Sequence, residues 1–341
     1  MKFSINVPVY NAERYLPRCL EALAGQDFDD YEIVIVNDGS IDSSPAICAE
    51  FQEAHKGMVR LIEQENRGLL LARCAGISKA RGEYCVFVDA DDVLKSDALS
   101  TINRAIQESG ADVVVFGASR DENFSRSCFS YDALIDASRA GGAEGLAAAR
   151  KMFASSPNLN SMWSKAVRKE CLGTQAELSR FGKLQMAEDA LQTAILFDRA
   201  ETVMAIPDIL YWYRVNDESI TLQKESAHLL LSDLNRAYAY IVTVVQGWDK
   251  SLLPFLYATW CRAMLSCLNR ALVASKDETK NDRARIIEDF YNDEVFLSAY
   301  SQADFSVSPT WTKLLLKLLV EGRAGVYLFC IDHLYESARR R

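Results

Sequence analysis

The stretch EIVIVNDGS, residues 32–40, is an unbroken β-branched run that leads into a polar turn. A strand with one face in water alternates apolar and polar residues, whereas a strand buried on both faces has a continuous apolar run. Residues 33–36 therefore predict a central strand of a parallel sheet. Neighbouring parallel strands are joined by long crossovers, usually helices, so we expect helices on both sides of this segment in the sequence.

The flanking sequence alternates strand and helix patterns in the way that such a sheet requires. The first helix pattern has apolar residues on one face, as at Leu16, Cys19 and Leu23, and Ser44 followed by Pro45 predicts the N-cap and first turn of the second. Repeated β-α units at this spacing predict an α/β fold, with a mostly parallel sheet and helices on both faces. The expected strands are 3–9, 33–36, 58–62, 84–88 and 112–116, and the expected helices are 13–23, 44–57, 69–80 and 96–110.

The rest of the chain divides into an irregular region and a helical one. Residues 134–153 are predicted to be helical with a break at Gly141-Gly142, and the chain from about residue 225 onward has almost wholly helical patterns. We therefore expect a Rossmann-like α/β domain over residues 1–222 and a helical accessory domain over residues 223–341. Helix caps in the second domain are predicted near Ser251, Asp277 and Ser308.

The composition excludes several classes of protein. The chain has 341 residues, of which 49% are hydrophobic and 25% charged, as in soluble globular proteins, and its net charge of -9 argues against nucleic-acid binding. Nine cysteines without a Cys-x-x-Cys pair, and only three histidines, predict reduced thiols in a cytosolic protein and neither disulfides nor a zinc site. No signal-peptide pattern and no uncharged apolar run of about 18 residues occurs, so no membrane-spanning helix is expected.

Polar residues follow three of the expected strands: residues 8–11 (PVYN), 37–40 (NDGS) and 89–92 (DADD). Open parallel sheets bind ligands beyond the carboxyl ends of their strands, so these three clusters are expected at one edge. Taken alone, an Asn-Asp-Gly-Ser segment is most often only a turn. The prediction of a site rests on the convergence of the three clusters.

The acidic cluster predicts the most specific chemistry. Asp89 and Asp91 are two positions apart, so in an extended strand end they point the same way, and their carboxylates repel unless a cation lies between them. Mg²⁺ and Mn²⁺ prefer such oxygen ligands and bridge to phosphates. The alternative is a solvated acidic turn that caps the next helix, a role open to Asp92.

Six segments taken together resemble the inverting family 2 glycosyltransferases with the GT-A fold. They occur in order across residues 3–221, and a set of ordered motifs is far more specific than any one of them. The dinucleotide fingerprint G-x-G-x-x-G is absent, as expected for a sugar nucleotide. The segments are SINVPVYNAERYLPRCL, EIVIVNDGSIDSS, ENRGLLLARCAGISKARGEYCVFVDADD, MWSKAVRKECL, AEDALQTAILF and YWYRVNDESIT.

The resemblance implies a metal-dependent enzyme with a nucleotide-sugar donor, and a UDP-sugar is the expected donor. Asp89 and Asp91 would form the DxD signature, with Asp91 the firmest ligand of Mn²⁺ or Mg²⁺ and Asp89 near the ribose or the metal. Pro8, Tyr10 and Glu13 would border the uracil or ribose. Asp38 would hydrogen-bond the base, and Arg73 would reach the donor. The whole donor set is Pro8, Tyr10, Glu13, Asp38, Arg73 and Asp89.

The resemblance also assigns the acceptor side. Asp189 matches the catalytic base of the family, and Glu188, Trp163 and Lys165 would line the acceptor side. The acceptor hydroxyl must lose its proton as it attacks, and a carboxylate within hydrogen-bond reach can take that proton. One direct displacement inverts the anomeric carbon. Without the resemblance, Glu188-Asp189 would be explained as an acidic helix N-terminus, which the helix dipole favours.

The expected reaction is therefore sugar transfer to a saccharide or lipid-linked saccharide in bacterial surface polysaccharide assembly. Two alternatives stay open: a non-catalytic nucleotide-sugar-binding or scaffold protein on the same fold, and a nucleotidyltransferase, which also uses acidic pairs.

Residues 310–319 (TWTKLLLKLL) place Trp311, Leu314, Leu315, Leu318 and Leu319 on one broad face. Such a helix either lies on a membrane surface or packs on its own domain or a second subunit. The expected location is the cytoplasm, with the inner face of the cytoplasmic membrane as a further option. A second copy of the chain, in a homo-oligomer, is a further expected partner.

Overall fold

The computed structural model describes residues 1–214, 227–275 and 278–335. The chain divides into two compact units, each of which has its own fold. The α/β unit comprises residues 1–153 and 158–215, and the helical unit comprises residues 154–157 and 216–341. The predicted boundary at residue 222 and the predicted cap at Asp277 lie outside the described residues.

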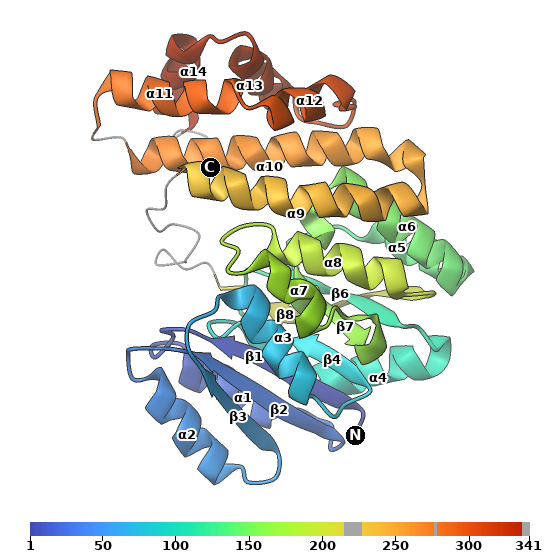
Figure 1. Ribbon diagram of the computed structural model, residues 1–341. Helices are drawn as coiled ribbons and strands as arrows, with labels where there is room; N and C mark the ends of the chain where they lie inside the picture. The colour runs from blue at the N-terminus through green and yellow to red at the C-terminus, as the bar shows by residue number, and fades with distance from the viewer. Residues whose placement is uncertain (215–226, 276–277, 336–341) are drawn as a thin grey trace. The chain divides into compact units, whose positions relative to one another are not determined.

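One sheet forms the centre of the α/β unit (Figure 1). Within the described residues its eight strands are β1 (Phe3–Val9), β2 (Tyr31–Asp38), β3 (Val59–Gln64), β4 (Tyr84–Phe87), β5 (Val93–Leu94), β6 (Val113–Ser119), β7 (Lys165–Arg168) and β8 (Val203–Trp212). They are ordered β3-β2-β1-β4-β7-β6-β8-β5. The first four are parallel, as are β6 and β8, whereas β7 and the edge strand β5 are antiparallel to their neighbours. This mixed, mostly parallel sheet confirms the predicted α/β fold.

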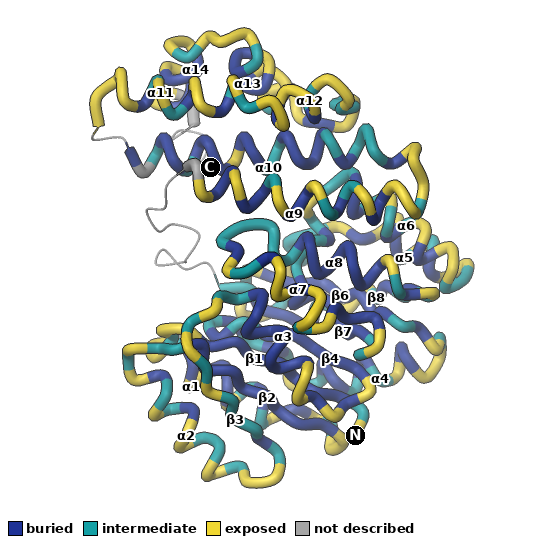
Figure 2. The backbone as a smooth tube through the Cα atoms, in the orientation of Figure 1, coloured by how far each residue is buried: buried dark blue, intermediate teal, exposed yellow. Residues whose placement is uncertain are grey.

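Helices pack on both faces of the sheet. The helices of the α/β unit are α1 (Leu16–Ala24), α2 (Ser44–Ala54), α3 (Leu69–Lys79), α4 (Ala98–Ser109), α5 (Asp132–Ala140), α6 (Gly142–Ser155), α7 (Gln175–Leu178) and α8 (Glu188–Arg199), of which α7 and α8 pack against α3. On one face Ile33 and Ile35 of β2 belong to the main core with α1 and α4, and on the other face Val36 packs against Ala72 and Ala75 of α3. The strand β2 is buried along its whole length, as its continuous apolar run predicts (Figure 2).

Two of the predicted helix starts differ from the observed ones. The helix α2 begins at Ser44, so Ser43 occupies the N-cap position, and the Ser44 hydroxyl instead accepts a hydrogen bond from the backbone N–H of Ala12 (2.9 Å). The helix α4 begins at Ala98 after Asp97, not at Ser96. The Ser44 hydroxyl is bonded to the loop after β1. Ser96 lies in the turn before α4, where its carbonyl accepts a hydrogen bond from the N–H of Asp27 (2.7 Å). The local sequence pattern does not reveal either contact.

Two glycine predictions hold. Gly110 has a φ of 66° and ends α4, because a left-handed conformation is cheap only for glycine. The predicted break at Gly141-Gly142 separates α5 from α6.

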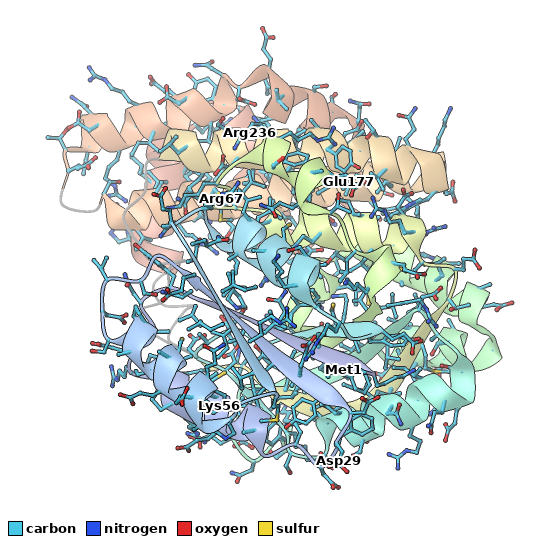
Figure 3. All side chains as sticks on the ribbon, turned by 60° about the horizontal axis from the view of Figure 1, so that its bottom comes forward. Met1, Asp29, Lys56, Arg67, Glu177 and Arg236 are labelled. Carbon is cyan, nitrogen blue, oxygen red and sulfur yellow. The ribbon has the colours of Figure 1, made fainter. Side chains whose placement is uncertain are left out.

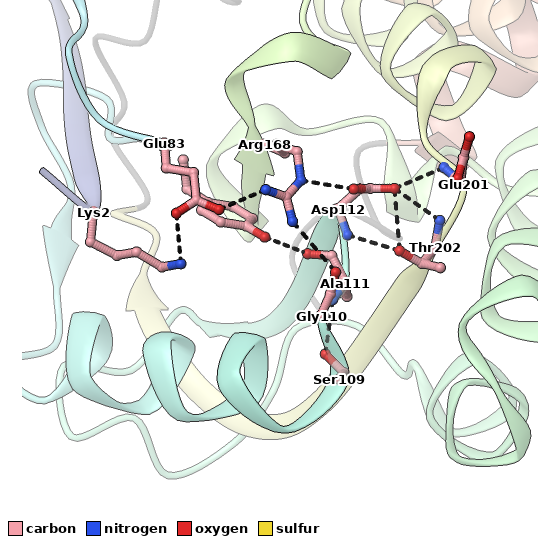
Figure 4. Close-up of polar contacts among 10 residues, drawn as sticks. Lys2, Glu83, Ser109, Gly110, Ala111, Asp112, Arg168, Glu201 and Thr202 are labelled. Atoms are coloured by element: carbon pink, nitrogen blue, oxygen red, sulfur yellow. Dashed lines mark hydrogen bonds and ion pairs between the residues drawn. The ribbon is translucent and has the colours of Figure 1, made fainter.

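The amino ends of the strands are joined by a polar network (Figure 4). Glu83, before β4, accepts from Lys2 Nζ (2.9 Å) and from Arg168 Nη1 (2.6 Å). Arg168 also donates through Nε to Asp112 (2.9 Å), and Asp112 accepts from the backbone N–H of Thr202, before β8 (3.2 Å). These contacts fasten the edge of the sheet that lies opposite the carboxyl ends of the parallel strands.

The helical unit confirms the helical pattern predicted for the last third of the chain. Its helices are α9 (Ala227–Trp248), α10 (Leu253–Ala274), α11 (Lys280–Tyr291), α12 (Glu294–Gln302), α13 (Thr310–Val320) and α14 (Ala324–Cys330). The helix α10 packs against α9, α11, α12 and α13, and its side chains Leu256, Met264 and Leu268 are buried.

Among the described residues, only the segment Lys250–Val273, which covers α10 as far as Val273, has the length and apolar composition of a membrane-crossing helix. A buried core helix has the same composition, and 56% of the most apolar window is buried within the structure.

Some charged side chains lie on the surface of the α/β unit, and most thiols are buried. Asp29 and Lys56, labelled in Figure 3, are exposed. The nine cysteines are all unpaired; eight are buried, and Cys128 is half-buried.

Candidate active site

Arg73 joins the two carboxylates that the sequence analysis assigns to opposite sides of the reaction. It lies on α3 and is fully buried. Its Nη2 donates to Oδ1 of Asp89 (3.2 Å), and its Nη1 donates to Oδ1 of Asp189 and to the side-chain oxygen of Gln192 (3.3 Å). Asp89 follows β4, whereas Asp189 and Gln192 lie on α8, so the cluster brings together three distant segments at the carboxyl edge of the sheet.

Negative charge exceeds positive charge in this cluster. Burial raises the pKa of Asp89 to about 6; Arg73 opposes this shift, while Asp189 and Asp91 add to it. Burial also raises the pKa of Glu188 to about 7, with Asp189 the next cause. The buried Arg73 itself has a raised pKa, because Asp189 and Asp89 outweigh the desolvation that would lower it. The carboxylates are therefore only partly neutralised by protein groups.

Asp92 supports the acidic turn and does not cap a helix. Its side chain is buried, with Oδ2 accepting from the Tyr211 hydroxyl (2.6 Å) and Oδ1 from the backbone N–H of Arg214 (2.8 Å). The Tyr211 oxygen in turn accepts from the backbone N–H of Asp89 (3.1 Å), and Arg214 Nε donates to the Asp91 carbonyl (2.9 Å). The strand β8 and the residues after it thus fix the backbone that carries Asp89 and Asp91.

The loops after β1 and β2 hold each other. The backbone N–H of Asn11 donates to the Ser40 hydroxyl (3.0 Å), and the side-chain oxygen of Asn11 accepts from the N–H of Ile41 (2.9 Å). Asn11 has a φ of 49°, the left-handed conformation that asparagine tolerates. Glu13 accepts from the N–H of Ser43 (2.8 Å), at the start of α2. These contacts explain why α1 begins three residues later than predicted, at Leu16.

The other predicted donor residues surround these loops. Pro8 lies in β1 opposite Val36 of β2, and the Tyr10 side chain is 38% exposed just beyond the strand. Tyr10 therefore offers an accessible aromatic ring at the carboxyl edge of the sheet.

Asp38 is buried and holds the loop that leads to α3. Its Oδ1 accepts from Gln64 Nε2 (2.7 Å) and from the N–H of Arg67 (2.8 Å), and its Oδ2 accepts from the N–H of Gly68 (2.8 Å). The carboxylate thus positions residues 64–68, and any contact with a base would use its remaining lone pairs.

The residues assigned to the acceptor side differ in accessibility. Asp189 has 29% of its side chain exposed, and Glu188 is half-buried beside it at the start of α8. Trp163 is buried in an aromatic stack with Tyr211, whose ring centroid is 4.8 Å away. Lys165 is fully buried in β7, donates to the Ser161 carbonyl, and has its pKa lowered by burial to about 7. Trp163 and Lys165 are therefore not open to solvent and can affect an acceptor only by supporting exposed neighbours.

Asp89 and Asp91 are suitable ligands for a divalent cation. No group of three or more His, Cys, Asp or Glu side chains in the described parts of the chain is arranged to hold a metal by itself. A cation that bridges protein to a diphosphate takes ligands from both, so it needs only one or two carboxylates from the protein. The surplus of negative charge around Asp89, together with hard oxygen ligands, fits such an ion.

Three residues of the site are not evident from the sequence: Gln192, Tyr211 and Arg214. Tyr211 and Arg214 lie in the segment YWYR, which contributed to the family resemblance without any assigned role. The Arg214 guanidinium lies over the rings of Tyr15 (4.7 Å) and Trp212 (4.4 Å), which hold its side chain beside the acidic turn.

Comparisons with known proteins agree with this geometry. Residues 4–134 match the model of the family described as Glycosyl transferase family 2. Over 64% of its length the chain is 33% identical to the glycosyltransferase GlyA of Streptococcus pneumoniae serotype 4, and over 64% it is 31% identical to the uncharacterized glycosyltransferase EpsJ of Bacillus subtilis. It spans only 31% of the first relative and 62% of the second.

A solved structure also resembles the chain. Residues 1–349 of Staphylococcus aureus TarS, in complex with UDP-GlcNAc, align over 99% of this chain and 92% of that one, with a TM-score of 0.63 and 20% identity. At this identity the likeness concerns the fold alone.

Proposed function

We propose that this chain, whose residues 4–134 match the model of glycosyl transferase family 2 and whose α/β unit has the GT-A fold, transfers a sugar from a nucleotide-sugar donor to a saccharide hydroxyl. The observation that carries the proposal is the buried Arg73, which links the carboxylate after β4 to the carboxylate at the start of α8. The relatives named above are glycosyltransferases, which supports this reaction over nucleotidyl transfer and over a purely structural role. TarS is a poly(ribitol-phosphate) β-N-acetylglucosaminyltransferase that binds UDP-GlcNAc, so a UDP-sugar is the first donor to test here.

The donor would bind at the carboxyl edge of the sheet. Tyr10 is exposed there and would stack on the base, while the interlocked loops that contain Asn11 and Glu13 would border the ribose. Asp89 and Asp91 would hold Mn²⁺ or Mg²⁺. When bound, such an ion would neutralise the charge that develops on the departing diphosphate.

Asp189 is the proposed base. Its Oδ1 is held by Arg73, whereas its Oδ2 makes no hydrogen bond within the described residues, and the side chain is partly exposed. Oδ2 can therefore accept the proton of an acceptor hydroxyl while Arg73 keeps the carboxylate oriented. A single displacement with one base inverts the anomeric carbon, so an α-linked donor would give a β-linked product.

The acceptor is proposed to be a saccharide or a lipid-linked saccharide of a bacterial surface polysaccharide, and the reaction would take place in the cytoplasm. The helices α13 and α14 support contact with the membrane surface. Val326 and Phe329 of α14 are 49% and 58% exposed, and the exposed Lys313, Lys317 and Arg323 lie nearby in the sequence. Apolar side chains beside basic ones suit an anionic lipid surface.

The face that the sequence predicts for α13 is divided in the structure. Leu315, Leu318 and Leu319 are buried, whereas Trp311 and Leu314 are 36% and 43% exposed. Part of the helix thus packs within its own unit, which was the alternative to membrane contact. The exposed part is available for a membrane or for a second copy of the chain.

Donor hydrolysis tests the proposed reaction without a known acceptor. The chain is incubated with UDP-, GDP- and TDP-linked sugars in the presence of Mn²⁺ or Mg²⁺, and the products are separated. Release of free nucleoside diphosphate is expected. Pyrophosphate as the product would identify a nucleotidyltransferase, and binding of donors with no turnover by any of them would favour the non-catalytic alternative.

A further inference from the structure

The helical unit contains a cavity of ≈ 380 Å³ between α9, α10 and α12. All residues that line it belong to the helical unit, and none of them has a part in the proposed transfer reaction. Small-molecule sites commonly have volumes of about 300–1,000 Å³, so this cavity is large enough for a small ring.

One wall of the cavity is aromatic and rigid. Trp260 and Tyr257 of α10 line it, with ring centroids 6.4 Å apart and an angle of 22° between the rings. Tyr238 of α9 stacks on Trp260 at 5.3 Å and 12°. Trp260 is buried, and its Nε1 has no hydrogen-bond partner within the described residues. The Nε1 atom is itself buried, so the part of this wall that faces the cavity is a flat apolar surface formed by the stacked rings.

The opposite wall is polar. Glu294, Ser298 and Gln302 are four positions apart on α12, so they lie on one face of the helix, and all three line the cavity. Gln302 Nε2 donates to the carbonyl (3.1 Å) and to the hydroxyl (3.3 Å) of Ser298, which leaves the Gln302 amide oxygen as an acceptor. Glu294, Ser298 and Gln302 are all exposed to solvent, so their oxygens are accessible to a ligand. This wall therefore offers a row of acceptors to a ligand with several hydroxyl groups.

The charge of the cavity excludes one class of ligand. Its lining contains the carboxylate of Glu294 but no Lys, Arg or His. A nucleoside diphosphate or a phosphate-bearing polymer would be repelled by this carboxylate and would meet no cation. The ligand that suits the cavity is neutral, with an apolar face for the aromatic wall and hydroxyl groups for the polar wall.

A sugar ring has this combination, because its C–H groups form an apolar face and its hydroxyls project from the edge. We propose that the cavity binds one ring of a neutral glycan. The proposal rests on the proposed function only in taking that glycan to be the acceptor or the product of the enzyme. Held there, a growing chain would stay attached to the enzyme between transfers.

The binding test uses the full chain and saturation-transfer NMR with cellotriose, chitotriose, maltotriose and UDP as separate probes. Ala239 of α9 is exposed and lines the cavity, so the variant Ala239→Met fills it without disturbing a buried core. Gln246→Met changes an exposed residue of the same helix that does not line the cavity and serves as the matched control. We expect at least one trisaccharide to bind, at least tenfold weaker binding in Ala239→Met, and unchanged binding in the control.

A second variant and an activity control complete the test. Glu294→Gln keeps the shape of the polar wall but alters its acceptors, and it should weaken binding about three- to tenfold. Donor hydrolysis should be the same in Ala239→Met as in the parent chain. Absence of binding by all three sugars, or binding that Ala239→Met leaves intact, would overturn the proposal, as would loss of UDP binding in that variant. If sugars bind in the cavity but no donor is hydrolysed, the proposed function fails and the cavity assignment stands.

Discussion

Arg73 determines how the carboxylates of the site are arranged. Its guanidinium is planar and presents several N–H groups at fixed angles, so it can hold Asp89 and Asp189 at the same time, which a lysine could not do with the same geometry. Because only Oδ1 of Asp189 is engaged, the other oxygen is left for the acceptor. The roles of the two aspartates are thus separated by a single buried residue.

Removal of the proposed base should abolish transfer and spare donor binding. In Asp189→Asn the amide keeps the shape of the side chain but cannot take a proton at neutral pH. We expect kcat to fall about 100- to 10,000-fold, the usual contribution of a general base, while the affinity for UDP changes less than threefold. Rates and calorimetric affinities are compared with those of Asp198→Asn, an exposed change near the other end of α8. Turnover by Asp189→Asn within tenfold of the parent rate would remove Asp189 from the mechanism.

Glu188 should make stability depend on pH. Its pKa is raised from the ordinary value of 4.5 to about 7, first by burial and then by Asp189, so the folded chain binds more protons than the unfolded chain between these values. The free energy of unfolding therefore decreases as the pH rises through this window.

The variant Glu188→Gln isolates this effect, because glutamine cannot ionise. At pH 7.5 it should be more stable than the parent by up to about 3 kcal/mol, and at pH 4.5 the difference should fall below about 0.5 kcal/mol. Urea unfolding at both pH values measures the difference. A variant that is no more stable than the parent at pH 7.5 would show that the Glu188 carboxylate is not destabilised in the folded state.

The residues of the site were predictable to different degrees. Asp89 and Asp91 stand in a short motif, and Arg73 and Asp189 were assigned from the resemblance, so all four were expected at the site. The contact of Arg73 with both Asp89 and Asp189 was not predicted. Gln192 and Tyr211 contact Arg73 and Asp92 across more than 100 positions of sequence, and no local pattern reports such a contact. The burial of Trp163 was missed for the same reason, since its stacking partner Tyr211 lies in a distant strand.

At the scale of elements, the loop after β2 depends on a glycine. Gly39 has a φ of 72°, and a Cβ placed there would lie 2.7 Å from the backbone nitrogen of Asn66. Gly110 has a similar φ of 66°, but a Cβ there would meet nothing within 4 Å. An alanine at Gly110 would therefore lose stability only through its left-handed backbone conformation. An alanine at Gly39 would lose stability through the same conformation and also through the clash of its Cβ with Asn66.

Substitution of each glycine by alanine tests this distinction. Gly110→Ala should cost about 1–2 kcal/mol of stability, the cost of the left-handed conformation, and leave UDP affinity unchanged. Gly39→Ala should cost about 1–3 kcal/mol more, because the loop must shift, and should weaken UDP binding. Urea unfolding and calorimetry give both quantities. Equal effects of the two substitutions would contradict the close packing of the loops after β2 and β3.

The strands of the sheet show where a pattern is informative. Strands β1 to β4 and β6 were expected, because each is a short apolar run between helix patterns. The strands β7 and β8 were not expected. β7 has only four residues, and β8 contains Pro207 and Asp208 in its middle, where its pairing with β6 shifts register. Proline and a register shift are typical of irregular strands, and tertiary pairing forms β8 in spite of them.

At the scale of the whole molecule, contact with a membrane would explain the exposed apolar residues of α14. The chain should sediment with vesicles of phosphatidylglycerol and phosphatidylcholine, and less with phosphatidylcholine alone. The double variant Val326→Ser, Phe329→Ser should reduce this binding at least fivefold, whereas Ile41→Ser, at an 89% exposed position of the α/β unit, should not. A parent chain that stays in the supernatant with both vesicle types would leave self-association as the explanation.

The proposed reaction depends on a divalent ion held between acidic side chains and a diphosphate, and calorimetric titration of the full chain with UDP tests this directly. We predict that Mn²⁺ strengthens UDP binding at least tenfold, about 1.4 kcal/mol, and that Asp91→Asn removes this gain without unfolding the chain. UDP binding that is absent, or equally tight with Mn²⁺ and with a chelator, would contradict the account.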